Sequence, residues 1–147
     1  MRESFKKSYS MLSIVLLALF LSCDSSTSPK DSVEGDYTAL IFFTTPTGGS
    51  ARNELQAGSS LNISLRSDGT TSGHLHVAAF GTNPAFDADM TGTWTQNGEE
   101  VEFTQAADTF VRDMVFRIER ISVSPWALVG DEVFSGTRIN LTLARNT

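Results

Sequence analysis

The sequence predicts an all-β domain, an eight-stranded antiparallel up-and-down barrel, behind an N-terminal export segment. From Gly35 onward, apolar and polar residues alternate with the period of two that is typical of half-buried strands. Turn dipeptides recur at short intervals along the same stretch, which is the pattern of a β-meander and not of helices. A flat sheet of eight short strands would expose two edges, and closure into a barrel removes them. A two-sheet β-sandwich is the structural alternative.

Composition limits the class of protein. The chain has 147 residues, 40% of them hydrophobic, with one cysteine and a net charge of −6. This length fits one ordinary domain, and a single cysteine argues against a disulfide framework or a zinc ribbon. Removal of residues 1–22 takes away three basic residues and one acidic residue, which changes the net charge from −6 to −8. An acidic domain repels phosphate backbones, so we expect no nucleic-acid partner.

The first segment, residues 1–22, predicts a signal peptide. Three cations lie within residues 2–7, and an apolar run with one serine covers residues 11–21. Such a run is too short to span a bilayer, which needs about 20 residues. The tetrad Phe20-Leu21-Ser22-Cys23 resembles the lipobox of bacterial lipoproteins, with Phe20 in place of the usual Leu. The resemblance implies that Cys23 becomes the diacylated first residue of the mature chain. An ordinary cleaved signal followed by a chance cysteine is the alternative.

Residues 23–34 predict a lipidated cysteine followed by a flexible tether. The run DSSTSPKDSVE is polar, built of small residues and contains proline, so it buries too little apolar area to offset the entropy of ordering. The folded domain is expected to cover residues 35–147. The expected location is the bacterial cell envelope, with the domain held at a membrane by its lipid and facing the periplasm or the cell exterior.

Turn signals divide the domain into eight strands. Asp68-Gly69 and Asn97-Gly98 each separate two alternating runs, and both dipeptides suit the positive φ angles of tight hairpin turns. We expect a short helix or an irregular loop at residues 50–57. The eight predicted strands cover residues 35–45, 60–67, 70–77, 90–96, 99–105, 110–118, 126–134 and 136–145.

Strand parity predicts which side chains fill the barrel. The stretch from Leu40 to Phe43 is apolar on both faces, so Leu40 and Phe42 are expected on an outer face that a loop, a partner or the membrane surface covers. The predicted inward set is Ile41, Phe43, Leu61, Ile63, Leu65, Leu75, Val77, Met90, Trp94, Phe103, Met114, Phe116, Ile118, Leu141 and Leu143.

The domain opens with a short motif of glycine and an aromatic residue. Gly35-Asp36-Tyr37 is similar to the Gly-x-Trp with which the first lipocalin strand begins, with Tyr in place of Trp. The resemblance implies that Tyr37 packs against an arginine near the end of the last strand, and Arg145 has the right parity. Such a cation–π contact is worth about 0.5–2 kcal/mol. The Asp68-Gly69-Thr70 turn and Gly92-Thr93-Trp94 also resemble small bacterial lipocalin-like lipoproteins, and the resemblance covers residues 35–147.

A ligand site is expected inside the barrel, which at eight strands is just wide enough to be filled or to hold one small molecule. Parity places Arg112 among apolar side chains, where it would anchor an acidic head group; a salt bridge to Asp108 or Asp113 at the rim is the alternative. Inward-facing Gly73 and Gly92 would open a pocket near Trp94, or let large rings pack. The predicted ligand-binding residues are Arg112, Trp94, Phe103, Met114, Phe116, Gly73 and Gly92.

Metal and catalytic signals are weak. His74 and His76 point the same way on one strand, but zinc needs further ligands, and two solvated histidines are the simpler interpretation. Asp87 and Asp89 supply too few oxygen ligands for calcium. No nucleophile elbow or phosphate-cradling loop is present, so we expect no cofactor and no enzyme activity, with a weak hydrolase as a remote alternative.

The sequence therefore predicts a membrane-anchored lipocalin-like lipoprotein that binds a small apolar or amphiphilic molecule inside its barrel. The alternative is a solid-cored barrel that serves the cell envelope as a structural module or contacts a protein partner through Leu40 and Phe42.

Overall fold

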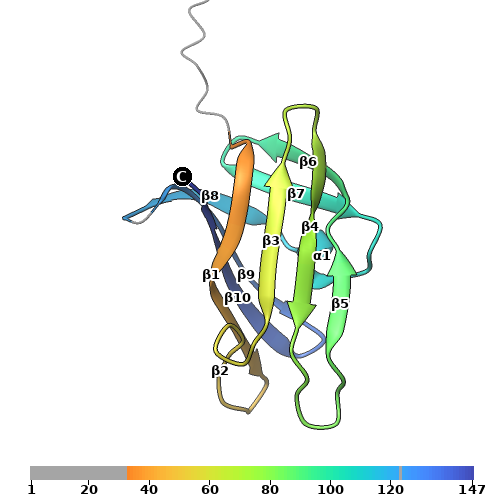
Figure 1. The fold of residues 1–147 in the computed structure, drawn as a ribbon. Coiled ribbons are helices and arrows are strands. Elements are labelled where there is room, and N and C mark those ends of the chain that lie inside the picture. Colours follow the sequence, from red (N-terminus) through yellow and green to blue (C-terminus); the bar gives the residue numbers. More distant parts are fainter. Residues whose placement is uncertain (1–32, 123) are drawn as a thin grey trace, which may run out of the picture. The chain divides into compact units, whose positions relative to one another are not determined.

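Antiparallel strands make up most of the described chain, residues 33–122 and 124–147 of a computed structural model (Figure 1). Residues 33–147 form one compact unit. The predicted signal peptide, Cys23 and the tether up to residue 32 lie outside the described residues. The elements are β1 (Gly35–Pro46), β2 (Arg52–Asn53), β3 (Ser60–Leu65), β4 (Thr70–Val77), β5 (Phe86–Asp89), β6 (Gly92–Asn97), β7 (Glu100–Gln105), α1 (Phe110–Asp113), β8 (Phe116–Ile121), β9 (Ser124–Phe134) and β10 (Thr137–Arg145).

Eight of these strands close into a barrel. Neighbours follow the order β10, β9, β8, β7, β6, β4, β3, β1, and β1 pairs in turn with β10, from Tyr37 opposite Arg145 to Pro46 opposite Thr137. All pairings are antiparallel, which confirms the predicted up-and-down barrel. The two short strands add to this ring: β2 pairs with β1, and β5 pairs with the half of β4 that β6 leaves unpaired.

Both predicted hairpins are confirmed at their turns. Gly69 and Gly98 have φ angles of +80° and +66°, the left-handed region in which glycine is favoured. The Asp68 carboxylate accepts hydrogen bonds from the backbone N and the hydroxyl of Thr70, at 2.9 and 2.6 Å. These bonds fasten the first turn and lower the pKa of Asp68 below its ordinary value.

A β-bulge in β1 corrects the predicted parity of that strand. The register between β1 and β10 shifts between Ala39 and Ile41, which inserts one extra residue at Leu40. One inserted residue moves every later side chain to the opposite face. Phe42 is therefore buried, with 1% of its surface exposed, whereas Leu40 and Ile41 are 45% and 38% exposed. The predicted outward position of Phe42 and the predicted inward positions of Ile41 and Phe43 are wrong.

The strand predicted at residues 110–118 begins only at Phe116. A helical turn, α1, precedes it and places Val111 and Met114 in the core, three residues apart. That spacing is helical and not the spacing of a strand, in which Phe110, Arg112 and Met114 would share a face. Residues 50–57 form β2 and a turn, which is the predicted irregular loop, and the acidic segment at residues 86–89 forms the additional strand β5.

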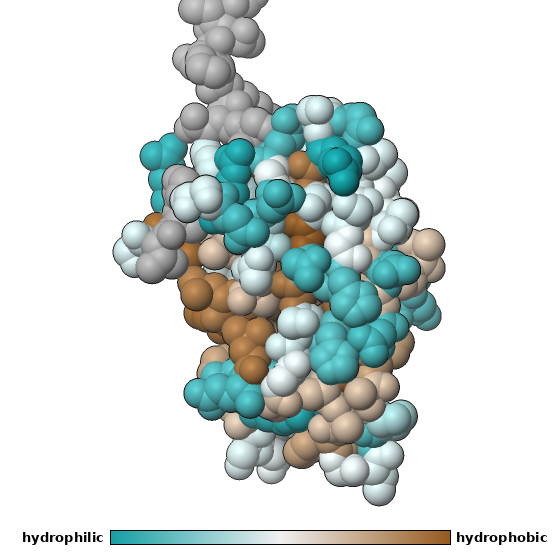
Figure 2. Space-filling view, viewed as in Figure 1, coloured by the Kyte–Doolittle hydropathy of each residue, from teal (hydrophilic) through white to brown (hydrophobic). Residues whose placement is uncertain are grey.

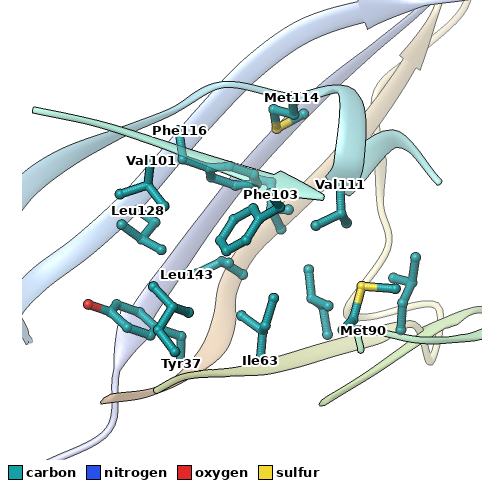
Figure 3. Close-up of a cluster of buried hydrophobic side chains, with 14 of the residues drawn as sticks. Tyr37, Ile63, Met90, Val101, Phe103, Val111, Met114, Phe116, Leu128 and Leu143 are labelled. Atoms are coloured by element: carbon teal, nitrogen blue, oxygen red, sulfur yellow. The ribbon is translucent and has the colours of Figure 1, made fainter. Parts of the chain in front are cut away.

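Apolar side chains from all sides of the barrel meet in one core (Figure 3). Phe103 of β7 and Phe116 of β8 meet edge to face, with ring centroids 5.3 Å apart, and Phe42 of β1 lies 5.7 Å from Phe110 of α1. The buried hydrophobic residues are Val33, Tyr37, Phe42, Leu61, Ile63, Leu65, Leu75, Ala88, Met90, Val101, Phe103, Val111, Met114, Phe116, Ala127, Leu128, Ile139, Leu141 and Leu143.

We expect Gly73→Ala to lower the free energy of unfolding by more than about 1 kcal/mol. A β-carbon at Gly73 would overlap the carbonyl oxygen of Asn62 on β3, and its φ of +150° disfavours an L side chain. Urea unfolding measures the change. Gly48→Ala is the control, because Gly48 also has a positive φ, +73°, but a β-carbon there would meet no atom within 4 Å. Equal losses in the two variants would show that the close approach of β3 and β4 at Gly73 has no energetic weight.

Candidate functional site

Three of the predicted ligand-binding side chains lie together inside the barrel. Phe103, Met114 and Phe116 are buried (Figure 3). Met114 and Phe116 lie over the backbone of Gly130. A β-carbon on Gly130 would overlap the sulfur of Met114, so the missing side chain makes room for the methionine. Such close packing of a side chain against a backbone is typical of protein cores. These side chains therefore pack against protein in the position where the sequence predicted a ligand.

Trp94 is half-buried and fastens a turn. Its Nε1 donates a hydrogen bond of 2.9 Å to the carbonyl oxygen of Arg66, and its backbone N donates one of 2.8 Å to the carbonyl oxygen of Gly69. Arg66 and Gly69 flank the tip of the β3–β4 hairpin. The indole thus joins this hairpin to β6 and also covers one margin of the core.

Gly73 and Gly92 each lie close to the backbone of a neighbouring strand. A β-carbon on Gly92 would overlap the carbonyl oxygen of Thr104 on β7, just as one on Gly73 would meet β3. The absence of a side chain lets neighbouring backbones approach closely. The two glycines therefore contribute to strand packing, and the pocket that the sequence predicts near Trp94 stays a prediction.

The predicted interior position of Arg112 is wrong as well. Arg112 belongs to α1, its side chain is 35% exposed, and its Nε lies 2.8 Å from Asp113 Oδ1. Its Nη2 also bonds Asp108, at 2.5 Å. The hydrogen bond to Asp113 and the two negative charges raise the pKa of Arg112 above its ordinary value. The alternative in the sequence, a local salt bridge with Asp108 and Asp113, is what the structure contains.

The three predicted barrel-closing residues lie together where the chain enters the barrel. Tyr37 is fully buried and pairs across the sheet with Arg145. Its hydroxyl donates a hydrogen bond of 2.6 Å to the carbonyl oxygen of Val33, and burial raises its pKa to about 12 while Arg145 opposes that rise. The Arg145 side chain passes over Gly35, where a β-carbon would lie only 2.5 Å from Nε. Gly35 is therefore required for this packing.

A pocket of about 310 Å³ lies at the opposite end of the barrel. This is the end at which β1 and β4 finish and β10 begins, seen at the bottom of Figure 1. The loop between β4 and β5 forms one wall, and the segment from β1 to β2 forms another. The pocket is lined by Thr44, Pro46, Ser50, Arg52, Val77, Ala78, Phe80, Asn83, Pro84 and Thr137.

A buried carboxylate organises the wall of this pocket. Glu54 is only 2% exposed, and its Oε1 accepts a hydrogen bond of 2.6 Å from the Thr44 hydroxyl. Its Oε2 accepts one of 2.9 Å from the Ser59 hydroxyl. Arg52 Nη1 lies 3.3 Å from both carboxylate oxygens. Burial of a carboxylate is costly unless its charge is balanced and its oxygens are hydrogen-bonded, and both conditions are met here.

The same network holds the β4–β5 loop. Ser59 Oγ accepts a hydrogen bond of 2.9 Å from the backbone N of Ala78, and Arg52 Nη2 donates one of 3.2 Å to the carbonyl oxygen of Ala79. The Arg52 guanidinium also stacks on Phe80, with Cζ 4.6 Å from the ring centroid. Arg52, Glu54 and Ser59 thus connect three segments that are distant in the sequence.

Sequence reasoning missed this site. Arg52 and Glu54 lie in a segment that the sequence marks only as a short helix or loop, with charged residues that solvent would normally surround. The one available signal was that Arg52 and Glu54, two opposite charges two residues apart, precede Gly58 and Ser59. Nothing local in the sequence indicates that the Glu54 carboxylate is covered by β1 and the β4–β5 loop.

The two histidines share one acidic partner on the outer surface. His74 Nε2 and His76 Nδ1 of β4 lie 2.9 and 2.8 Å from Asp87 Oδ1 of β5, and His74 Nδ1 lies 3.7 Å from Asp89. Hydrogen bonds from His76 and then His74 lower the pKa of Asp87. Within residues 33–122 and 124–147, no three His, Cys, Asp or Glu side chains are placed to hold a metal ion.

None of the helices in the described part of the chain is both long enough and apolar enough to cross a bilayer.

Comparison with known proteins gives one distant structural match. The chain matches no protein-family model, and no curated protein matches its sequence. A solved structure of a redesigned β-barrel superposes with a TM-score of 0.38 at 13% sequence identity, over 78% of this chain and 91% of that one.

We expect the Asp87 contacts to stabilise the domain in a pH-dependent way. Because the pKa of Asp87 is lowered by folding, its contribution is present above the ordinary carboxyl pKa of about 4 and is lost as the pH falls through the lowered value. Asp87→Asn should therefore reduce the free energy of unfolding at about pH 6, with a deficit that shrinks on further acidification. Urea unfolding across pH measures it. Asp89→Asn removes the same formal charge at a longer contact and should cost less; an equal, pH-independent deficit in both variants would contradict the prediction.

Proposed function

We propose that this chain is a lipid-anchored β-barrel of the bacterial cell envelope that binds a small apolar or amphiphilic molecule and performs no catalysis. The observation that carries the proposal is the pocket of about 310 Å³ at the end of the barrel. Small-molecule sites are concave, mostly apolar and equipped with a few polar groups that orient the ligand. Apolar surface comes here from Pro46, Val77, Phe80 and Pro84, and polar groups come from the lining set given above.

The proposed ligand binds at the end of the barrel and not in its middle. Phe103, Met114 and Phe116 pack against one another and against Gly130, so a ligand among them would have to displace core side chains. The cost of opening a well-packed core is several kcal/mol, roughly that of a large core substitution. The pocket beside Arg52 offers space without that cost.

Lipid anchoring rests on the sequence alone. Phe20-Leu21-Ser22-Cys23 resembles a lipobox, and a polar run of residues follows it before Val33. In the proposed lipoprotein, this run is a tether between the acylated Cys23 and the barrel.

A second candidate function is a protein-interaction or structural module of the envelope. The bulge in β1 exposes Leu40 and Ile41 side by side, and Figure 2 shows hydrophobic surface over the middle of β1. Exposed apolar patches of this kind favour contact with another protein or with a membrane surface. The filled core is equally compatible with this candidate.

The pocket is tested by filling it. We expect Ala78→Leu to abolish binding of the neutral fluorophore N-phenyl-naphthylamine to residues 25–147, because Ala78 lies in the pocket wall. Fluorescence titration gives the affinity, and native mass spectrometry shows whether a molecule copurifies with the unmodified domain. Ala106→Leu is the matched control. Ala106 is exposed in the β7–α1 loop, so this variant should leave binding unchanged. Unaltered binding in Ala78→Leu would move the site elsewhere.

The anchor is tested on the full chain. In a bacterial host we expect Cys23 to acquire a lipid, seen as a mass increase of the mature protein and as membrane association in a flotation assay. Cys23→Ser should abolish both. A mature wild-type protein without lipid would show that the segment is an ordinary cleaved signal.

A further inference from the structure

The pocket contains one charged side chain, and that charge is already balanced. Of the ten lining residues, Arg52 alone carries a formal charge. Its Nη1 faces both oxygens of Glu54, which is held in place by Thr44 and Ser59. Because the carboxylate is buried and bonded from two sides, it cannot turn away when a ligand enters. An anionic ligand would therefore compete with a fixed negative charge beside Arg52 and would also face a chain of net charge −6.

Arg52 nevertheless retains hydrogen-bonding capacity. A guanidinium has five N–H donors in a rigid fork. Glu54 accepts a hydrogen bond from Nη1 and the carbonyl oxygen of Ala79 accepts one from Nη2. The Phe80 ring packs against the face of the guanidinium. The side chain is 21% exposed, in the wall of the pocket. A guanidinium that is already fixed in place and has further N–H donors is well suited to bind a single oxygen acceptor. Its side chain loses little conformational entropy when the ligand binds.

The remaining wall of the pocket is suited to a short apolar body. Phe80, Pro84, Pro46 and Val77 present carbon surface around the guanidinium. A volume of about 310 Å³ is at the lower end of the range for small-molecule sites, about 300–1,000 Å³, so the ligand is compact.

We propose that this pocket selects an uncharged molecule that places a ketone, ester or amide oxygen on Arg52 and a short apolar body against Phe80 and Pro84. Arg52 then determines specificity by hydrogen bonding, and Glu54 excludes anions while it positions Arg52. This inference rests on the proposed ligand-binding function and names the ligand class of the same pocket.

Three small probes of similar shape test the proposal on residues 25–147, which contain the whole compact unit. Acetophenone has a neutral carbonyl oxygen, benzoate has a negative charge, and ethylbenzene has no acceptor. Dissociation constants come from NMR titrations that follow the backbone amide of Ala78 and the Nε–H of Arg52. We expect acetophenone to bind roughly tenfold more tightly than either of the other probes, the effect of about one hydrogen bond to a charged donor.

A conservative substitution isolates Arg52. Arg52→Lys keeps a positive charge beside Glu54 but loses the planar fork and the stack on Phe80. In this variant we expect acetophenone and ethylbenzene to bind with about equal dissociation constants, so the preference is lost. The affinity for ethylbenzene itself should be nearly unchanged. Arg120→Lys is the matched control: Arg120 also stacks on an aromatic ring, with Cζ 5.2 Å from the centroid of Trp126, but does not line the pocket. This variant should keep the preference.

The outcomes separate this inference from the function on which it rests. A tighter acetophenone complex, with a shift of the Arg52 Nε–H, supports the inference even if Arg52→Lys does not fold. Equal affinities of acetophenone and ethylbenzene overturn recognition by Arg52 but leave a binding pocket. Tightest binding of benzoate overturns the exclusion of anions. No binding of any probe at millimolar concentration overturns the inference and argues against small-molecule binding at this pocket.

Discussion

The pairing of β1 with β10 is the constraint on which the other features depend. It runs from Tyr37 opposite Arg145 to Pro46 opposite Thr137 and turns a sheet with two edges into a ring. Closure fixes the width of the interior, and at eight strands that width is filled by side chains. It also brings Thr137 beside Pro46, so closure of the ring completes one wall of the pocket at this end.

Two other seams of the ring are short, and local elements support them. β4 meets β6 over two residue pairs, and β7 meets β8 over two. Beyond the first seam, β5 takes over the pairing of β4, and near the second, α1 places Val111 and Met114 in the core. Single backbone hydrogen bonds extend both seams, from Trp94 N to the carbonyl oxygen of Gly69 and from Ile118 N to that of Glu99. The barrel therefore combines one long seam with two short ones.

Much of the fold follows from local signals in the sequence. Alternation and the Asp68-Gly69 and Asn97-Gly98 turns predict the hairpins, because turn geometry and side-chain parity act within a few residues. The bulge at Leu40 is not visible to such reasoning, since a single extra residue among four apolar ones leaves the composition unchanged. The prediction for Arg112 was wrong for a related reason. The residues around Arg112 suit a helical turn and a strand equally well. The burial of Glu54 depends on segments far away in the chain, which no local pattern reports.

The direction of β1 has a consequence for access. This strand starts beside Arg145, at the end where the chain enters the barrel, and finishes at Pro46, in the pocket wall. Chain entry and pocket thus lie at opposite ends of a strand of 12 residues, a distance of about 40 Å at the usual rise per residue. If the chain is held at a bilayer through its N-terminal side, the mouth beside Arg52 can open toward the aqueous phase. A molecule in the aqueous phase could then reach the pocket without passing the end at which the chain enters the barrel.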